Sequence, residues 1–443
     1  MSPSDLGVVE KGHGKGVPTL VVHPFLKGSS EGEDSARLPE ARLEEAVSLA
    51  EAINLDVVDA VTVPVAALRP ATYMGSGKVG EIGDRIKAHD IALVVMDCEL
   101  SPGQQRNLER AWSAKVIDRT GLILEIFGER AQTREGRLQV QLAHLTYQKS
   151  RLVRSWTHLE RQRGGVGFMG GPGETQIEAD RRALDEQITR IRKSLDSVVK
   201  TRALHRKARK AVPHPVVALV GYTNAGKSTL FNRLTRADVM AEDMLFATLD
   251  PTMRGLTLPS GRRIILSDTV GFISHLPTQL IAAFRATLEE VTEADIIVHV
   301  RDIAHPETDA QKADVEQVMR DLGIEEGEER PVIETLNKID LLDPGSRDEI
   351  VNRTTLDARK VALSAITGKG VDRLLAAIDS EMMRRSSVHD IKLRYHEGKA
   401  LAWLYEHGQV LERHDRSRAI HLSVRLTDAD WSRFEKSHPH KPA

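Results

Sequence analysis

This chain lacks the cysteines, the long apolar runs and the excess of positive charge that are typical of several classes of protein. Its one cysteine among 443 residues, Cys98, excludes an internal disulfide and a cysteine-rich zinc site, and suits a reducing compartment. No apolar run approaches the roughly 18 to 20 residues that a membrane-spanning helix needs, so a soluble protein without integral membrane association is expected. The first 16 residues lack the apolar core of a signal peptide, which makes the cytoplasm the expected location. The net charge of -2 excludes a uniformly basic nucleic-acid coat.

Apolar runs alternate with helical patterns between residues 38 and 129. Helices are predicted near 41–53 and after Ser101, and strands near 60–65 and 91–96, an alternation typical of a small α/β domain. Glycines 75, 77 and 80 match the G-x-G-x-x-G pattern, but no clear strand leads into them and no acidic residue is placed for a ribose. A tight turn that opens a helix is therefore favoured over dinucleotide binding.

Two long segments follow with apolar residues at alternating spacings of four and three. They are Leu138, Leu142, Leu145, Leu152, Trp156 and Leu159, and then Leu184, Ile188, Ile191, Leu195 and Val198. This periodicity predicts an antiparallel coiled-coil hairpin. The residues between the segments include six glycines in 164–173 together with Phe168 and Met169, which predicts a non-helical loop suited to a partner.

Positive charge is concentrated in this predicted hairpin. Residues 149–210 hold 16 Lys and Arg against 7 Asp and Glu, a net charge of +9. Such a cluster can neutralise phosphates of RNA, although a charged helix surface that merely faces solvent is the common alternative. The neighbouring glycine-rich loop favours RNA binding.

A phosphate-binding pattern follows the buried run 215–220. It is G-x-x-x-x-G-K-S, formed by Gly221, Tyr222, Thr223, Asn224, Ala225, Gly226, Lys227 and Ser228. After a strand and before a helix, this pattern surrounds a nucleotide β-phosphate with backbone N–H groups. Lys227 is predicted to contact the β- and γ-phosphates and the Ser228 hydroxyl to bind Mg²⁺.

Three further elements follow in the order and strand context that a GTP-binding domain requires. The predicted strand 263–266 leads to the D-x-x-G residues, and the strand 332–336 leads to N-K-x-D, in which the Asp340 carboxylate can accept hydrogen bonds from guanine N1 and N2. The backbone of a later S-A pair can contact guanine O6. These residues are Asp268, Thr269, Val270 and Gly271; Asn337, Lys338, Ile339 and Asp340; and Ser364 and Ala365.

The segment 245–252 lies between the P-loop and the D-x-x-G and is a candidate switch. One of its threonines is expected to be the second protein ligand of Mg²⁺, ordered by the γ-phosphate. Thr248 is favoured, and Thr252 competes on spacing.

These residues resemble the HflX family of translation-factor-related GTPases. The residues that carry the resemblance are Gly171, Gly173, Glu174, Thr175, Gln176 and 180–182, then 245–252, 268–273 and 282–290. The resemblance covers about residues 43–370. It implies a protein that binds the large ribosomal subunit and its RNA through the N-terminal domain and hairpin, and that dissociates or rescues stalled or idle ribosomes, often under stress. It also places five switch residues at the nucleotide site, with Thr248 on Mg²⁺: Phe246, Ala247, Thr248, Leu249 and Asp250.

The sequence predicts slow hydrolysis by the protein alone. The expected catalytic residues are Lys227, Thr248 and Gly271, but Phe272 stands where Ras-like enzymes have a water-positioning glutamine, and no arginine finger is evident. The ribosome is the expected stimulant. Asn224 resembles the P-loop asparagine of related GTPases that use K⁺ in place of that arginine; the alternative is that it braces the loop.

The expected architecture is α/β with five parts. They are a disordered tail (1–20), an N-terminal α/β domain (21–134), a basic helical hairpin (135–212), a P-loop GTPase domain with a mainly parallel sheet (213–385) and a small C-terminal α+β domain (386–443). A monomer is expected. Two other functions remain open: a nucleotide-driven enzyme that remodels free RNA, and a non-ribosomal regulatory GTPase that recruits a protein.

Overall fold

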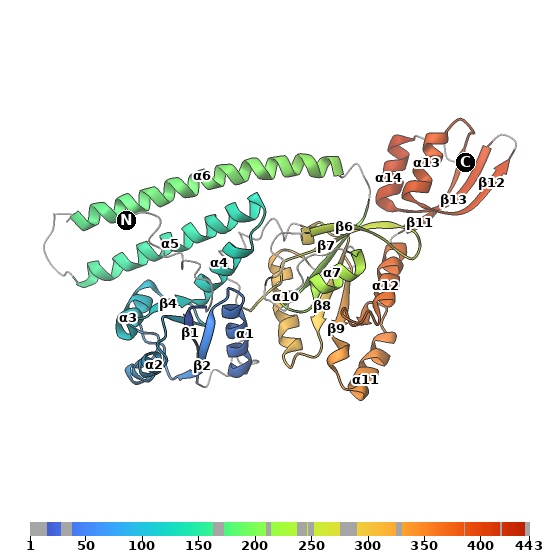
Figure 1. Cartoon of the computed structure of the whole chain (residues 1–443). Coiled ribbons are helices and arrows are strands. Elements are labelled where there is room, and N and C mark those ends of the chain that lie inside the picture. Colours follow the sequence, from blue (N-terminus) through green and yellow to red (C-terminus); the bar gives the residue numbers. More distant parts are fainter. Residues whose placement is uncertain are drawn as a thin grey trace. The chain divides into compact units, whose positions relative to one another are not determined.

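The computed structural model describes most of the chain as two compact units (Figure 1). The described residues are 16–27, 38–162, 172–209, 214–236, 246, 252–274, 290–324, 330–384, 386–416 and 419–438, without the side chains of 153–162, 172–177, 199–209 and 428–429. The first unit comprises residues 1–197 with 244–246 and 276–284, and the second comprises the other residues. Each unit is considered separately.

The first unit contains a four-stranded parallel sheet with strand order β2-β1-β3-β4. Its elements are β1 (Pro18–Leu26), α1 (Pro39–Glu51), β2 (Asp56–Val65), α2 (Ser76–Ala88), β3 (Leu93–Met96), α3 (Pro102–Trp112), β4 (Lys115–Asp118) and α4 (Arg119–Arg130). A helix in each connection allows the strands to run parallel. The G-x-G-x-x-G residues open a helix as predicted, but not through a tight turn of glycines: Gly75 is the extended N-cap of α2, and Gly77 and Gly80 lie within the helix.

Strand β1 corrects the predicted tail, because it begins at Pro18 and so includes the last residues of 1–20. Residues 1–15 lie outside the described part. Pro24 within this strand argues against a central position in a sheet, since proline has no N–H to donate. The structure resolves the conflict: the pairing of β1 with β3 ends at Val22, and Pro24 pairs only with β2.

Two long helices, α5 (Arg134–Gln162) and α6 (Pro172–Arg209), follow the sheet. The predicted apolar seam is confirmed where side chains are described, because one cluster joins Leu138, Leu142, Leu145, Leu184, Ile188, Ile191 and Leu195. Trp156 and Leu159 of the seam fall outside the described side chains. Of the predicted loop 164–173 only Pro172 and Gly173 are described, and they begin α6, so the non-helical prediction is wrong for these two residues.

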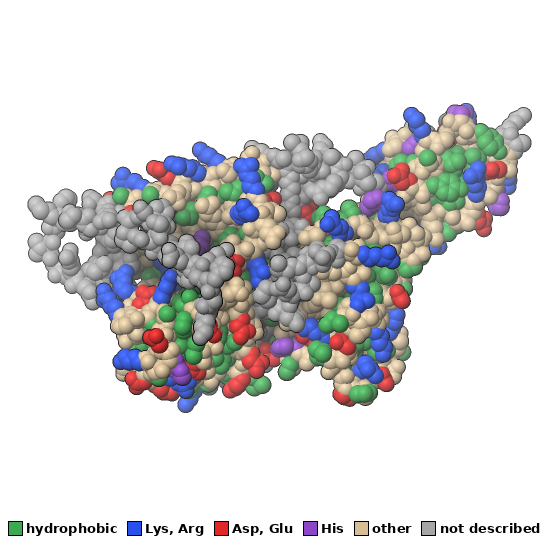
Figure 2. All heavy atoms as spheres, in the orientation of Figure 1, with side chains coloured by type: hydrophobic (Ala, Val, Ile, Leu, Met, Phe, Trp, Pro, Cys, Tyr) green, Lys and Arg blue, Asp and Glu red, His purple; other side chains and the backbone are tan. Residues whose placement is uncertain are grey.

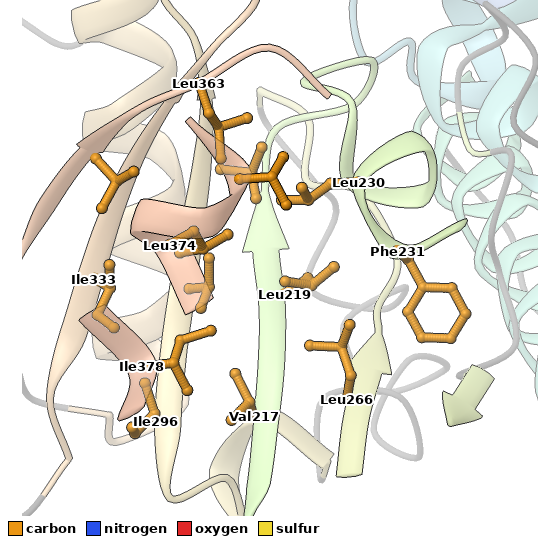
Figure 3. Packing of buried hydrophobic residues seen from close by; sticks show 14 of the residues in the cluster. Val217, Leu219, Leu230, Phe231, Leu266, Ile296, Ile333, Leu363, Leu374 and Ile378 are labelled. Carbon is orange, nitrogen blue, oxygen red and sulfur yellow. The ribbon is translucent and has the colours of Figure 1, made fainter. Parts of the chain in front are cut away.

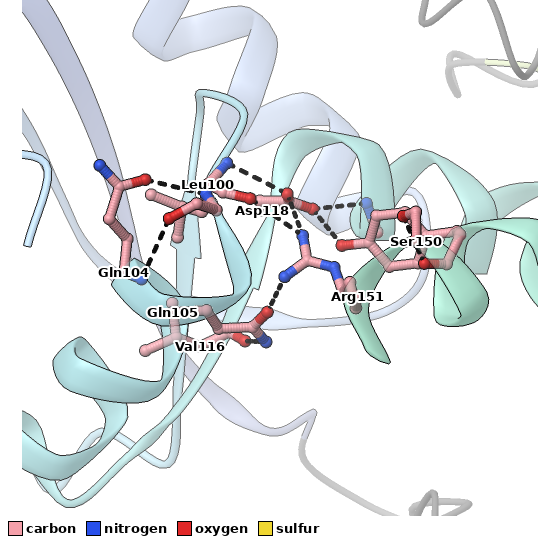
Figure 4. A network of polar contacts seen from close by, with 10 residues as sticks. Leu100, Gln104, Gln105, Val116, Asp118, Ser150 and Arg151 are labelled. Atoms are coloured by element: carbon pink, nitrogen blue, oxygen red, sulfur yellow. Dashed lines mark hydrogen bonds and ion pairs between the residues drawn. The ribbon is translucent and has the colours of Figure 1, made fainter. Parts of the chain in front are cut away.

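A buried carboxylate fastens α5 to the sheet (Figure 4). Asp118, at the end of β4, has no exposed surface and accepts hydrogen bonds from the N–H groups of Leu100 (3.2 Å) and Gly121 (2.9 Å). It also accepts one from the Tyr147 hydroxyl (2.6 Å) and forms an ion pair with Arg151, both on α5. Because a buried carboxylate is stable only when its lone pairs are satisfied, this network holds the middle of α5 against the sheet.

The second unit is built around a six-stranded sheet with order β10-β9-β8-β5-β7-β6. Its elements are β5 (Val216–Gly221), α7 (Lys227–Thr235), β6 (Thr252–Thr257), β7 (Arg263–Asp268), β8 (Ile296–Asp302), α10 (Thr308–Asp321), β9 (Val332–Asn337), the 3₁₀ helix η3 (Ile339–Leu341), α11 (Pro344–Thr355), β10 (Lys360–Ala362) and α12 (Val371–Arg384). The strands are parallel except β6, which pairs antiparallel with β7. Apolar side chains from β5, β7, β8, α7 and α12 form the core of one face (Figure 3).

The end of the chain forms a separate small sheet with helices on it. Its elements are β11 (Ser386–Leu393), α13 (Gly398–His407), β12 (Gln409–Arg416), β13 (Ala419–Thr427) and α14 (Asp428–Ser437), with antiparallel strand order β11-β13-β12. The predicted α/β architecture with a C-terminal α+β region is confirmed.

Candidate nucleotide-binding site

The P-loop joins the carboxyl end of β5 to α7, at the edge of the sheet where parallel α/β folds bind ligands. Gly226 has φ +91°, and a Cβ there would lie 2.3 Å from Nδ2 of Asn337. Only glycine fits this position, because a residue with a side chain would be strained in this left-handed backbone conformation and its Cβ would clash with the Asn337 amide. The same amide donates to the Ala225 carbonyl (2.8 Å), so the P-loop is held by a residue of the N-K-x-D motif.

Lys227 is the first residue of α7, and its side chain is buried. Its Nζ donates to the carbonyls of Gly221 (3.1 Å) and Tyr222 (2.7 Å). Burial lowers the pKa of Lys227 to about 8, against the opposing effect of the nearby Asp268 carboxylate. An anion bound beside this ammonium group would favour its charged form. Thr223 Oγ1 is also buried here and has no hydrogen-bond partner in the described part of the chain.

Ser228 and Asp268 offer oxygen atoms suited to a hard cation. The Ser228 hydroxyl donates to Oδ2 of Asp268 at 2.8 Å, and Asp268 is fully buried at the end of β7. Hydroxyl and carboxylate oxygens are ligands that Mg²⁺ accepts beside phosphate oxygens, so these residues fit the ion. No group of three or more His, Cys, Asp and Glu residues in the described ranges could hold a metal by itself.

The D-x-x-G segment lies directly against the P-loop. A Cβ on Gly271 would stand 2.8 Å from Cγ2 of Thr223 and 3.0 Å from Nζ of Lys227, so glycine permits this approach. Thr223 N–H donates to the carbonyl of Phe272 (2.8 Å), and Phe272 N–H donates to that of Gly221 (3.1 Å). The Phe272 ring is buried, with 1% exposed. An apolar buried ring cannot orient a water molecule, in agreement with the reasoning from sequence.

The N-K-x-D and S-A residues meet the P-loop at the carboxyl ends of β9 and β10. Asn337 is the link, because its Oδ1 accepts a hydrogen bond from the Ala365 N–H (2.9 Å) while its Nδ2 binds the P-loop. Lys338 has φ +65° and forms an ion pair with Asp302 at 2.8 Å. Asp340 lies in η3 and is exposed, whereas Ser364 is buried. Three motifs that are up to 144 residues apart are thus joined by direct hydrogen bonds.

The switch segment 245–252 is described only at Phe246 and at Thr252, the competing candidate for Mg²⁺, which begins β6 and pairs with Asp268 in the sheet. The Phe246 ring is 2% exposed and meets the ring of Phe127 of α4 edge-on, with centroids 4.8 Å apart. Residue 246 belongs to the first unit. Ala247, Thr248, Leu249 and Asp250 lie outside the described residues, so their placement at the nucleotide, and that of Phe246, stays a prediction.

Comparison with known proteins decides the family. Four family models match in succession: "GTP-binding GTPase N-terminal" over 40–128, "GTP-binding GTPase Middle Region" over 130–209, "50S ribosome-binding GTPase" over 216–338 and "HflX C-terminal domain" over 349–442. GTPase HflX of Magnetococcus marinus is 49% identical over 89% of this chain and 90% of its own length. GTPase HflX of Escherichia coli is 41% identical over 96% and 97%. The chain belongs to the HflX GTPase family.

As an HflX GTPase, the chain hydrolyses GTP, and the family match extends beyond the part anticipated from sequence. The resemblance was limited to about residues 43–370, but the fourth model continues to residue 442. That model begins at residue 349, in α11, although β10 pairs with β9 and the core of this sheet includes residues of α12. No helix in the described part of the chain is long and apolar enough to cross a membrane.

The hairpin of this HflX-family chain differs from the sequence reading in one respect. Arg151 was counted among the cations that could neutralise phosphates, but its guanidinium is engaged by Asp118 and Gln105 and lies over the Tyr147 ring. Lys149 likewise pairs with Asp185. Lys and Arg side chains do line α6 (Figure 2). However, 149–152 and 178–198 together carry seven Lys and Arg and five Asp and Glu, so most of the net positive charge belongs to residues whose side chains are not described.

Two residues of the site escaped the sequence reasoning. Asp302 at the end of β8 pairs with Lys338, and Arg233 of α7 donates to the carbonyls of Ala365 and Ile366. Neither belongs to a motif that the sequence analysis recognised. The one available signal was their position in the sequence: Asp302 comes shortly after a predicted strand, and Arg233 lies in the helix that follows the P-loop.

Proposed function

We propose that this chain is a GTP-driven switch that binds the large ribosomal subunit and dissociates or rescues stalled or idle ribosomes. The observation that carries the nucleotide part is the direct contact of P-loop, D-x-x-G and N-K-x-D residues at one edge of the sheet, with Asn337 bonded to both Ala225 and Ala365. The "50S ribosome-binding GTPase" match over 216–338 supports the ribosomal part. We further propose that the protein works in the cytoplasm as a monomer.

In this proposal each motif has one task. Backbone N–H groups of 221–228 and the N-terminus of α7 hold the phosphates, and Lys227 places its charge on them. Ser228 and Thr248 hold Mg²⁺, which would neutralise charge on the β- and γ-phosphates, and Gly271 reports the γ-phosphate. Asp340 selects guanine, because an adenine would leave its carboxylate without the N1 and N2 donors. The backbone of 364–365 adds the contact to guanine O6.

Hydrolysis by the free protein should be slow, and the buried ring of Phe272 supports this. The partner must then order the switch or supply the group that positions water. Asn224, exposed and with φ +56°, is the residue that would hold K⁺ if the cation acts in place of an arginine finger. Replacing K⁺ by Na⁺ should then reduce turnover, while an equal rate in both salts would leave Asn224 as a brace for the loop.

The hairpin is proposed to reach ribosomal RNA. Its net charge of +9 supports contacts to phosphates, and such contacts weaken steeply with salt. A solvated helix surface would not give salt-sensitive binding, which separates the two interpretations.

The deciding experiment measures GTP hydrolysis with and without purified large subunits, and co-sedimentation with GDP and with a non-hydrolysable GTP analogue. Stimulation together with binding selective for the GTP state is expected, and release of large from small subunits should be followed by sucrose-gradient sedimentation. A Lys227→Ala variant serves as the nucleotide control. Strand separation of free RNA would favour a remodelling enzyme instead, and salt-insensitive binding to a protein without ribosome co-sedimentation would favour a regulatory GTPase.

A further inference from the structure

We propose that Arg233 is a positioning residue for guanine recognition, which holds the loop 364–368 against the P-loop helix α7. This inference rests on the proposed assignment of guanine binding to Asp340 and that loop. Arg233 lies in the second turn of α7, on the helix that begins with Lys227. The loop follows β10, more than 130 residues later in the chain.

The guanidinium of Arg233 binds two consecutive peptide groups of the loop. Its Nε donates to the carbonyl of Ala365 and its Nη2 to that of Ile366. Because the guanidinium is a rigid planar fork, two parallel donations set the orientation of both peptides. Gly368 makes room for this approach: its φ is +87°, and a Cβ there would lie 2.7 Å from Nη1 of Arg233.

The hydrogen bonds within the loop do not hold the carbonyls of Ala365 and Ile366. The N–H of Gly368 donates to the Ser364 carbonyl (2.8 Å), and that of Thr367 to the Ser364 hydroxyl (3.1 Å). These bonds close the turn but use neither carbonyl that Arg233 binds. The side chain of Ile366 is 67% exposed, so packing contributes little to its position.

Arg233 completes a ring of contacts between the phosphate and base ends of the site. Ala365 donates its N–H to Asn337, which also binds the P-loop carbonyl of Ala225, and gives its carbonyl to Arg233. The peptide groups on both sides of Ala365 are therefore tied to the P-loop or to the helix that follows it. The N–H groups of 364, 365, 367 and 368 already donate within the described part of the protein, so the N–H to present to guanine O6 is that of Ile366, in the peptide group whose carbonyl Arg233 holds. Ordering this peptide before the nucleotide arrives keeps the entropic cost of ordering out of the binding step.

The test compares GDP with 6-thio-GDP, in which sulfur, a weaker acceptor, replaces O6 while the N1 and N2 donors remain. Arg233→Ala should weaken GDP binding by about 10-fold, chiefly through faster dissociation, as expected for loss of hydrogen bonds from a charged donor. Binding of 6-thio-GDP should weaken by less than about 3-fold, because that ligand has already lost most of the contact that the loop provides. Arg233→Lys keeps the charge and one hydrogen bond, so its GDP affinity should lie between those of the unchanged protein and Arg233→Ala.

Arg236→Ala is the matched control, since it removes the same charge at the C-cap of α7 and should change neither affinity. Equal weakening of both ligands by Arg233→Ala would show a general structural role and overturn the inference, as would no change in either. Thermal melting identifies a variant that fails to fold, and Arg233→Lys then supplies the comparison. Asp340→Asn should weaken GDP binding whatever Arg233 does. If it does so while Arg233→Ala is silent, only the present inference fails; if it does not, the proposed guanine site fails.

Discussion

Lys227 gives a prediction that follows from its burial. The free protein holds this ammonium group among backbone carbonyls, and desolvation lowers its pKa to about 8 from the usual 10.5 of a lysine. Nucleotide phosphates beside Nζ would restore the charged form and raise the pKa again. We therefore expect GDP binding to be coupled to uptake of a proton by Lys227.

The size of the effect follows from the two protonation states. At pH 8 about half of the free protein lacks the proton, whereas nearly all of the complex carries it, so binding should take up about half a proton. Affinity should fall by about tenfold between pH 7 and pH 9. Folding is affected as well. Between pH 8 and 10.5 the unfolded chain still carries the Lys227 proton while the folded protein has lost it, so the free energy of unfolding of the free protein should rise with pH over this range.

Isothermal titration calorimetry at pH 8 in two buffers of different ionisation enthalpy measures this uptake directly. Lys227→Arg is the control, because a guanidinium stays charged throughout this range and should remove the uptake even where affinity is reduced. Uptake below about 0.1 proton in the natural protein would mean that Lys227 is already charged when free, and the argument from desolvation would be refuted.

Three further outcomes test the surrounding structure. Gly226→Ala should reduce GDP affinity by about 100-fold in a fluorescence titration, because the new Cβ would lie 2.3 Å from Nδ2 of Asn337 and would push that amide out of place. A GDP affinity within a factor of three of the original would contradict this. Arg151→Ala should lower the free energy of unfolding of the first unit by about 3 kcal/mol in urea, since it leaves the fully buried Asp118 without its cation, and a loss below about 0.5 kcal/mol would show the pair to be dispensable. Burial lowers the pKa of His299 to about 3 in the folded protein, so on acidification this histidine is protonated first in the unfolded chain, which should lower the free energy of unfolding by about 2 kcal/mol at pH 5. His299→Gln should remove this part of the pH dependence of stability, and a variant with the same pH dependence as the original protein would contradict the assignment.

The nucleotide edge could be read from sequence because its chemistry depends on local spacing. A buried run followed by G-x-x-x-x-G-K-S has one useful conformation, a strand, a loop and a helix, and the later motifs each end a strand of the same parallel sheet. The apolar seam of the hairpin was equally visible, since residues 138–145 and 184–195 repeat at helical spacing. Strand β1 was missed because residues 1–20 were assigned to a tail and the alternating pattern was followed only from residue 38; only the sheet shows that 18–26 pairs with β2 and β3.

What the sequence determined by itself was the set of motifs and the family to which they belong, because phosphate, metal and guanine recognition require particular residue types at short spacing. Only the tertiary structure decided which charges are already used. Arg151 looked available for RNA until Asp118, 33 residues away, was found beside it, and Arg233 had no assigned task until the loop at Ala365 was found against α7. The reason is physical: a side chain's charge is known from its letter, but its partners lie across the fold, and a charge that is desolvated and paired there is not free to bind anything else.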